Sequence, residues 1–217
     1  MLSRPALIVL AAGRGSRFLG SHHKLAQALG PSTVLGTTLR HAIETHLPVV
    51  VVTTEPLADL ARRSVAARDV VVLPEVAGER IDPPPSSSSQ LALGMGYSIA
   101  AGVSARPDAM GWLILPGDMP IVQAATLRAV AEQLGQHPVV YAQYHGRRGH
   151  PVAFASELYS ELTGLRGDEG ARRLVARYPA FGLEVDDAGV LIDVDTEADL
   201  ALVRSAHDGA VSAARGA

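Results

Sequence analysis

The sequence predicts an α/β protein in which helices cover both faces of one doubly wound, mainly parallel sheet. The first observation is a series of short apolar runs, β-branched in the middle and bounded by Gly or Pro, at residues 6–12, 47–54, 69–74 and 111–117. Such runs are typical of strands buried on both faces. The second observation is that segments with helical spacing of apolar residues alternate with these runs, at residues 34–46, 57–61 and 127–134. This alternation is typical of a parallel sheet.

The length of the chain fits one domain. It has 217 residues, of which 47% are hydrophobic, enough for a single well-buried core. We assign residues 1–206 to this domain and expect residues 207–217 to form a frayed, disordered tail. Residues 78–90, "GERIDPPPSSSSQ", are rich in Pro and Ser and predict an exposed loop, which would be a linker or a flap over an active site.

The second half of the chain adds shorter elements. A helical pattern covers residues 91–103, and "PVVYAQYHGRRGHPVAFA" (138–155) predicts a β-hairpin. The elements expected after the hairpin are helices near 156–163 and 169–178, strand-like runs at 181–185 and 190–194, and a last helix from Thr196.

Composition excludes several classes of protein. The formal charge is −3, from 19 basic and 22 acidic residues, so no overall field favours nucleic acid or an anionic membrane. The absence of Cys excludes disulfides, thiolate metal sites and cysteine nucleophiles. No apolar run approaches the ~20 residues of a membrane span, and "ALIVLAA" lacks the flanks of a signal peptide. We therefore expect a soluble, cytoplasmic protein that binds neither nucleic acid nor membrane.

A glycine-rich, basic loop follows the first predicted strand. Gly13 and Gly15 allow backbone N–H groups to approach a phosphate closely, and Arg14, Arg17 and Lys24 add positive charge. The loop is therefore a candidate phosphate cradle. An ordinary glycine-rich turn between strand and helix, with solvated cations, would have the same composition.

Carboxylates follow two later apolar runs. Asp118, in "LPGDMP", comes directly after a predicted buried strand, where ligands of α/β sheets bind, so it could hold Mg²⁺ against a phosphate. Asp193 and Asp195 alternate along an expected strand end and would share one face, so either could be the second ligand. The alternatives are a turn role for Asp118 and a helix N-cap at Asp195 or Thr196.

The predicted hairpin carries positive charge. Arg147, Arg148 and His150 lie in its turn and second strand, and Asp168 precedes a helix that contains Arg172. Such a hairpin could close over an anionic acceptor substrate. Basic residues at an exposed hairpin tip also serve solubility alone, and the residues by themselves favour that second interpretation.

Six segments, taken together, resemble a known family. In chain order these segments are "LAAGRGSRF…K", "GMGYSIAAG", "LPGDMP", "GRRGHPVAF", "GDEGAR" and "DVDTEADL". With them, residues 6–204 resemble the nucleotidyltransferases of molybdenum cofactor maturation, above all the molybdenum cofactor cytidylyltransferases. It implies a single-domain, Rossmann-like three-layer nucleotidyltransferase fold with a mainly parallel sheet and a β-hairpin insertion. It also implies transfer of a nucleotide from CTP to the terminal phosphate of molybdopterin, with release of pyrophosphate.

The resemblance implies a role for each matching residue. Arg17 and Lys24 would neutralise the triphosphate, and Asp118 and Asp195 would hold Mg²⁺ as the cofactor. The acceptor would contact Arg148, His150 and Asp168. The residues that would bind the nucleotide are Leu10, Ala11, Ala12, Gly13, Arg14, Gly15, Ser16, Arg17, Lys24, Gly94, Ser98 and Asp118.

The base preference also follows from the resemblance. Ala11-Ala12-Gly13 matches the A-A-G of cytidylyltransferases rather than the A-G-G of guanylyltransferases, and Gly94 and Ser98 match the segment that faces the base. We therefore expect CTP rather than GTP. His23 stands where the family pattern usually has Pro before its lysine, and we expect His22 and His23 to lie in a solvated loop.

Three other functions remain open from the sequence. The chain could be a guanylyltransferase, a nucleotidyltransferase that acts on another phosphorylated metabolite, or a non-catalytic carrier of the molybdenum cofactor. In the carrier role it would be a maturation chaperone for a molybdenum hydroxylase. The enzyme itself would contact such a hydroxylase transiently.

Overall fold

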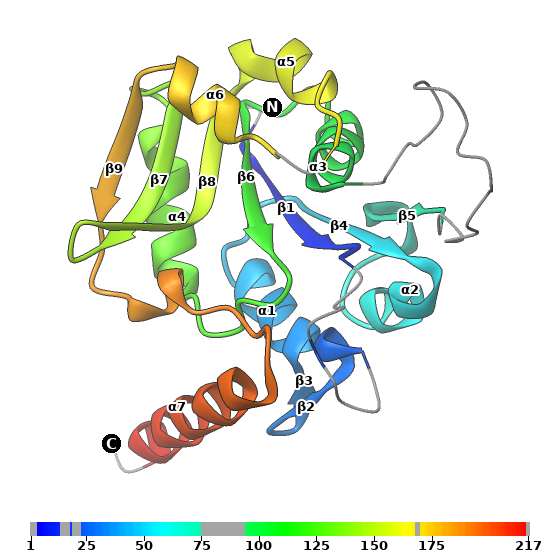
Figure 1. The fold of residues 1–217 in the computed structure, drawn as a ribbon, viewed down its shortest axis with the longest axis vertical. Helices are drawn as coiled ribbons and strands as arrows, with labels where there is room; N and C mark the ends of the chain where they lie inside the picture. The colour runs from blue at the N-terminus through cyan, green and yellow to red at the C-terminus, as the bar shows by residue number, and fades with distance from the viewer. Residues whose placement is uncertain (1–3, 14–17, 19–22, 75–93, 168–169, 216–217) are drawn as a thin grey trace, which may run out of the picture.

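A computed structural model describes residues 4–13, 18, 23–74, 94–167 and 170–215. Its centre is a seven-stranded sheet in the order β5-β4-β1-β6-β8-β7-β9 (Figure 1). β8 is antiparallel to both of its neighbours, and the other neighbouring pairs of this sheet are parallel. The strands are β1 (Ala6–Ala11), β4 (Val49–Thr54), β5 (Val70–Leu73), β6 (Gly111–Pro116), β7 (Val139–Tyr144), β8 (Arg147–Ala155) and β9 (Ala180–Glu184), with β2 (Ala28–Leu29) and β3 (Ser32–Thr33) in a separate two-stranded sheet.

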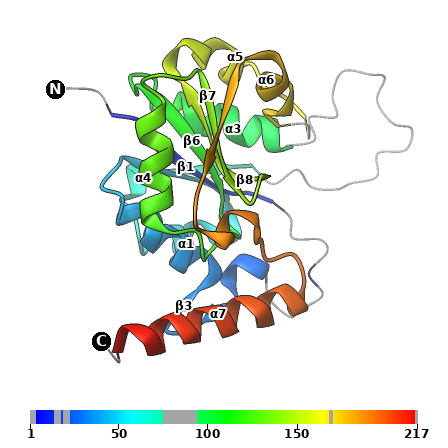
Figure 2. The same ribbon diagram turned by 90° about the vertical axis from the view of Figure 1, so that its left-hand side faces the viewer.

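Helices cover both faces of the large sheet, as Figure 2 shows for α1 and α4 on one side and α3 on the other. The helices are α1 (Val34–Ile43), α2 (Glu55–Arg62), α3 (Met95–Ser104), α4 (Ala124–Gln133), α5 (Tyr159–Thr163), α6 (Arg172–Arg177) and α7 (Glu197–Arg215). Four 3₁₀ turns complete the described elements: η1 (Lys24–Ala26), η2 (Ala67–Asp69), η3 (Ser156–Leu158) and η4 (Ala188–Leu191). The predicted α/β class, mainly parallel sheet and hairpin are confirmed.

The core consists of two layers because successive strand residues point to opposite faces. In β1, Leu7 and Val9 join a cluster with residues of α1, α2 and α4, whereas Ile8 joins a second cluster with residues of α3, α5 and α6. These three β1 side chains are all fully buried. A strand covered on both faces must be apolar at every position, which is the pattern that identified it in the sequence.

The expected strand at residues 190–194 is wrong. The chain there forms η4 and then an irregular segment. The carboxylate of Asp187 explains this, because it accepts hydrogen bonds from the Gly189 N–H (3.0 Å), the Gln123 N–H (2.9 Å) and the Thr126 hydroxyl (2.7 Å). These bonds fold the segment against the start of α4. Val190 and Val194 are buried, as their apolar pattern predicts, but this segment does not pair with a strand of the sheet.

The C-terminal helix is longer than the sequence analysis expected. α7 runs to Arg215, past residue 206, where the expected tail would begin. It lies beside the small β2–β3 sheet in both views (Figures 1 and 2), and the Arg204 guanidinium donates to the Ala28 carbonyl at 2.9 Å. The loop expected at residues 78–90 lies outside the described residues. Within the described part of the chain, no helix is long and apolar enough to cross a membrane.

Candidate active site

The candidate site lies at the carboxyl edge of the large sheet, where β1 and β6 end side by side. From β1 the chain proceeds to β4 on one side, and it reaches β6 on the other side later. Open α/β sheets bind ligands at such a change of direction. The Gly117 N–H donates to the Leu10 carbonyl at 2.8 Å, and this contact fixes the residue after β6, Asp118, beside the end of β1. Asp118 is therefore in the position that the sequence predicted.

Three carboxylates meet at this edge. The Val194 N–H donates to the Asp118 carbonyl at 2.9 Å, so the irregular segment after η4 passes directly over the end of β6. One carboxylate oxygen from each of Asp118, Asp193 and Asp195 then lies within 4.8 Å of the others. Asp193 and Asp195 do reach a common cluster with Asp118, although the segment that carries them is not a strand.

The N-cap of α7 does not fall on Asp195. The Thr196 hydroxyl accepts from the Asp199 N–H at 3.2 Å, and the Asp199 carboxylate accepts from the Thr196 N–H at 2.7 Å. This reciprocal arrangement is a capping box, with Thr196 as the N-cap. These hydrogen bonds hold the pKa of Asp199 below its ordinary value, the Thr196 hydroxyl contributing most. The Asp195 carboxylate is thus directed at the acidic cluster instead.

Lys24 extends into the same cluster from η1. Its Nζ atom lies 2.6 Å from Asp118 Oδ2 and 2.6 Å from Asp195 Oδ1, and its side chain is only 10% exposed. Burial lowers the pKa of Lys24, but the charge of Asp118 and the hydrogen bonds to both carboxylates outweigh it, so the net pKa is raised. Lys24 is therefore a firmly charged ammonium between two carboxylates.

Negative charge still exceeds positive charge in this cluster. Three carboxylates face one ammonium, and partial burial together with the charges of Asp118 and Asp195 raises the pKa of Asp193. Asp118 Oδ1 is buried and has no hydrogen-bond partner among the described residues. A cluster of carboxylates whose negative charge exceeds that of its ammonium partner is the donor set of a hard divalent cation such as Mg²⁺ or Mn²⁺. The residues present thus fit such an ion.

His23 links the cluster to the end of β1. Its Nδ1 accepts from the Leu25 N–H at 3.2 Å and caps η1, and its Nε2 lies 2.9 Å from the Gly13 carbonyl oxygen. The two contacts define one neutral tautomer, in which Nε2–H donates to Gly13. The sequence analysis placed His23 in a solvated loop and missed this role. The available signal was its position directly before Lys24, where the family pattern has Pro.

The predicted nucleotide-binding residues divide into two groups. Leu10, Ala11, Ala12 and Gly13 lie at the end of β1, next to Asp118, and Leu10 and Ala12 pack on the layer that contains α3. Gly94 is the N-cap of α3, and Ser98 is buried one turn later. Arg14, Gly15, Ser16 and Arg17 lie outside the described residues, as does Asp168 from the predicted acceptor site.

The hairpin borders the acidic cluster through the first residues of β8, just after the turn. A Cβ atom on Gly149 would collide with the Val190 carbonyl oxygen, so β8 is in direct contact with η4. Burial and the charge of Arg148 lower the pKa of His150 to about 4, against an opposing effect of Asp193. His150 is therefore a neutral imidazole at neutral pH. Arg148 lies 4.8 Å from the Tyr141 ring centroid, and Arg147 is exposed.

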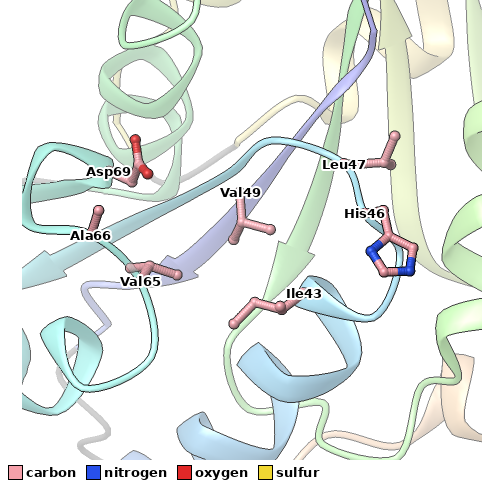
Figure 3. Close-up of a pocket in the computed structure, with 7 residues that line it drawn as sticks. All are labelled: Ile43, His46, Leu47, Val49, Val65, Ala66 and Asp69. Atoms are coloured by element: carbon pink, nitrogen blue, oxygen red, sulfur yellow. The ribbon is translucent and has the colours of Figure 1, made fainter.

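A shallow pocket lies elsewhere on the molecule. It has a volume of about 350 Å³ and lies at the start of β4, whereas the acidic cluster is at the edge where the parallel strands end (Figure 3). Its lining residues are Ile43, His46, Leu47, Val49, Val65, Ala66 and Asp69. None of them belongs to the predicted site.

Solved structures share this fold. Rv0371c from Mycobacterium tuberculosis H37Rv matches with a TM-score of 0.75 and 27% identity, over 94% of this chain and 100% of that one. A structure of the same protein is a complex with manganese, at a TM-score of 0.73 and the same identity and coverage. A nucleotidyl transferase from Methanothermobacter thermautotroptrophicus matches with a TM-score of 0.73 at 23% identity, over 94% of this chain and 97% of that one.

Sequence comparison is consistent with these structures. The purine catabolism protein PucB of Bacillus subtilis (strain 168) is 33% identical over 118 residues, which are 52% of this chain and 57% of PucB. The chain thus aligns with little more than half of that relative. The model of the MobA-like NTP transferase domain matches residues 7–181, which contain β1, Lys24 and Asp118. The chain therefore belongs to the MobA-like NTP transferase domain family and is a nucleotidyltransferase.

Proposed function

We propose that this nucleotidyltransferase is a magnesium-dependent cytidylyltransferase that transfers CMP from CTP to the terminal phosphate of molybdopterin and releases pyrophosphate. The observation that carries the proposal is the cluster of Asp118, Asp193, Asp195 and Lys24 at the carboxyl ends of β1 and β6. It combines the ligands of a divalent cation with a cation suited to phosphate oxygens, which is what transfer of a nucleotide between two polyanions needs.

The residues have distinct tasks in this proposal. Asp118 and Asp195 hold Mg²⁺, and Asp193 is the third oxygen donor of the cluster. An ion held by these residues would supply positive charge against the negative charge that develops as pyrophosphate leaves. The manganese complex of Rv0371c supports a divalent cation in a chain of this fold. The loop from Leu10 to Arg17 and the Lys24 ammonium bind the triphosphate.

The protein needs no covalent nucleophile. An oxygen of the acceptor's terminal phosphate attacks the α-phosphorus, a new P–O–P bond forms, and the bond to the leaving pyrophosphate breaks. Catalysis then consists of holding both reactants in line and neutralising their charges. Arg148 and His150, with Asp168, are the proposed acceptor side. A neutral His150 can donate one hydrogen bond and accept another.

The choice of CTP depends on the loop after β1 and the start of α3. Ala11 and Ala12 in the A-A-G segment favour cytosine over guanine, and Gly94 and Ser98 lie at the N-terminal turn of α3 where the base would bind. A cytoplasmic location and transient contact with a molybdenum hydroxylase, the recipient of the cytidine form of the cofactor, belong to the same proposal.

Calorimetric titration with CTP, GTP, ATP and UTP, each with and without Mg²⁺, tests the nucleotide side. We expect Mg²⁺-dependent binding with CTP preferred, and release of pyrophosphate when molybdopterin is added. Preference for GTP would change the base in the proposal. Binding of CTP without release of pyrophosphate from it when molybdopterin is added would exclude this acceptor and indicate another phosphorylated metabolite.

A further inference from the structure

Lys24 occupies one carboxylate oxygen of Asp118 and one of Asp195, both of which are candidate ligands of a metal ion. Its Nζ is 2.6 Å from both Asp118 Oδ2 and Asp195 Oδ1, so one ammonium joins the residues after β6 to the segment after η4. These contacts span 94 and 171 residues of sequence. The ammonium thus acts as a counterion of the cluster.

A divalent cation and this ammonium compete for these two oxygens. Mg²⁺ binds oxygen at about 2.0–2.1 Å, and the ammonium already contacts the same atoms at hydrogen-bond distance. Two neighbouring cations in a partly buried site also repel each other strongly. Asp118 Oδ1 has no hydrogen-bond partner among the described residues, but binding of the metal through Asp118 Oδ2 and Asp195 Oδ1 requires the ammonium to move away.

We propose that Lys24 is an exchangeable internal counterion, which leaves Asp118 and Asp195 when the divalent cation binds and then pairs with the triphosphate. This inference rests on the proposed function for the identity of the anion that receives the ammonium. The exchange makes metal and nucleotide binding depend on each other. The metal alone must displace Lys24 into a site without a new anion, whereas the nucleotide supplies one.

The surroundings of Lys24 suit a moving side chain on a fixed backbone. Leu25 is 3% exposed and anchors η1 in the core, and the His23 ring caps the turn. The lysine stem is flexible, so the ammonium can change partners without a backbone shift. Because the Lys24 side chain is only 10% exposed, the ammonium needs an anionic partner in its new position. The exchange is therefore favoured only when an anion arrives.

Manganese binding without nucleotide tests the exchange. Free Mn²⁺ is counted by electron paramagnetic resonance during titration of the wild type, Lys24→Met and Lys24→Arg. We expect Lys24→Met to bind Mn²⁺ at least about tenfold more tightly than the wild type, which corresponds to about 1.4 kcal/mol. Lys24→Arg keeps a competing cation and should not gain affinity. Equal or weaker binding by Lys24→Met would overturn the proposal.

Two controls separate displacement from other effects. Arg172→Met removes a nearby cation that lowers the pKa of His150. Among the described residues Arg172 forms no ion pair with the three aspartates, so its loss should change Mn²⁺ affinity by less than about twofold. A gain as large as that of Lys24→Met would mean a general field effect and overturn the exchange. If Lys24→Met is less stable without metal, thermal unfolding gives a second readout, since Mn²⁺ should raise its Tm more than that of the wild type.

The outcomes distinguish this inference from the proposed function. Tighter Mn²⁺ binding by Lys24→Met, in a protein whose wild type releases no pyrophosphate from CTP and molybdopterin, would support the counterion and refute the cytidylyltransferase. An active wild type, together with unchanged Mn²⁺ affinity in Lys24→Met, would support the cytidylyltransferase and refute the counterion exchange.

Discussion

At the scale of single residues, the site is defined by charge. The two carboxylate oxygens of Asp118 have different surroundings. Oδ2 accepts a hydrogen bond from Lys24, whereas Oδ1 is buried without a partner among the described residues. A residue that serves stability alone would be expected to satisfy both oxygens. The arrangement indicates that Asp118 is retained for a ligand.

Replacement of Asp118 by Asn should separate chemistry from folding. Asn keeps the shape and one oxygen for the Lys24 hydrogen bond but removes the charge that binds the cation. We expect turnover to fall by at least about 100-fold, while Tm changes by only a few degrees. Pyrophosphate release and thermal unfolding measure the two effects. A variant that retains turnover under limiting Mg²⁺ would show that the metal is held elsewhere.

A second prediction at this scale concerns His23. Its ring caps η1 and contacts Gly13, so His23→Ala should lose both contacts, whereas His23→Asn retains an oxygen that can accept from the Leu25 N–H. We expect Ala to cost about 1 kcal/mol of stability and Asn less. Because Lys24 follows directly, both variants should also weaken CTP binding, Ala the more strongly. Denaturant unfolding and calorimetry measure this, and equal effects of both substitutions would argue against capping.

At the scale of elements, the hairpin is the unit whose contacts with the site are sensitive to pH. The folded-state pKa of His150, about 4, lies below the ordinary value of 6.5. Between these values the unfolded chain binds a proton that the folded chain does not, so stability must rise with pH. The contribution of His150 is complete above pH 6.5 and is lost as pH falls toward 4.

Thermal unfolding of the wild type and His150→Gln between pH 4 and pH 8 tests this. Gln does not titrate, so the wild type should lose up to about 3 kcal/mol more than the variant as pH falls from 6.5 to 4. The slope of the difference is informative even where the substitution changes stability at every pH. Parallel profiles would mean that β8 does not bury His150 in solution.

Some elements of the fold could be predicted from the sequence and others could not. The apolar runs of β1, β4 and β6 could be identified because burial on both faces leaves a signal at every position. Asp118 could be placed because it directly follows such a run. The irregular segment after η4 could not be identified, since Val190 and Val194 alternate as a strand would. Two of the three Asp187 bonds that prevent a strand, those from Gln123 and Thr126, join residues far apart in the sequence. The pairing of Lys24 with Asp118 and Asp195 is equally non-local.

At the scale of the whole molecule, the site depends on the C-terminal segment returning to the sheet edge. β1 and β6 supply the loop and Asp118, but Asp193 and Asp195 arrive only after the chain has completed β9. Asp187 fixes the position of this segment, because its buried carboxylate accepts hydrogen bonds from residues at the start of α4. The cluster is thus a product of the complete fold rather than of any one motif.

Replacement of Asp187 by Ala should therefore weaken metal binding, although Asp187 is not a member of the acidic cluster. Three donors lose their acceptor, and buried donors without partners cost about 1–3 kcal/mol each where water cannot replace the lost bond. We expect the free energy of unfolding to fall by at least about 2 kcal/mol and Mn²⁺ affinity to fall several-fold, because Asp193 and Asp195 are no longer held beside Asp118. The adjacent, exposed Asp186→Ala is the matched control and should change neither quantity appreciably. Unchanged Mn²⁺ affinity in a destabilised Asp187→Ala variant would contradict this prediction. It would show that the packing of Val190 and Val194, rather than the hydrogen bonds of Asp187, holds the segment after η4 beside Asp118.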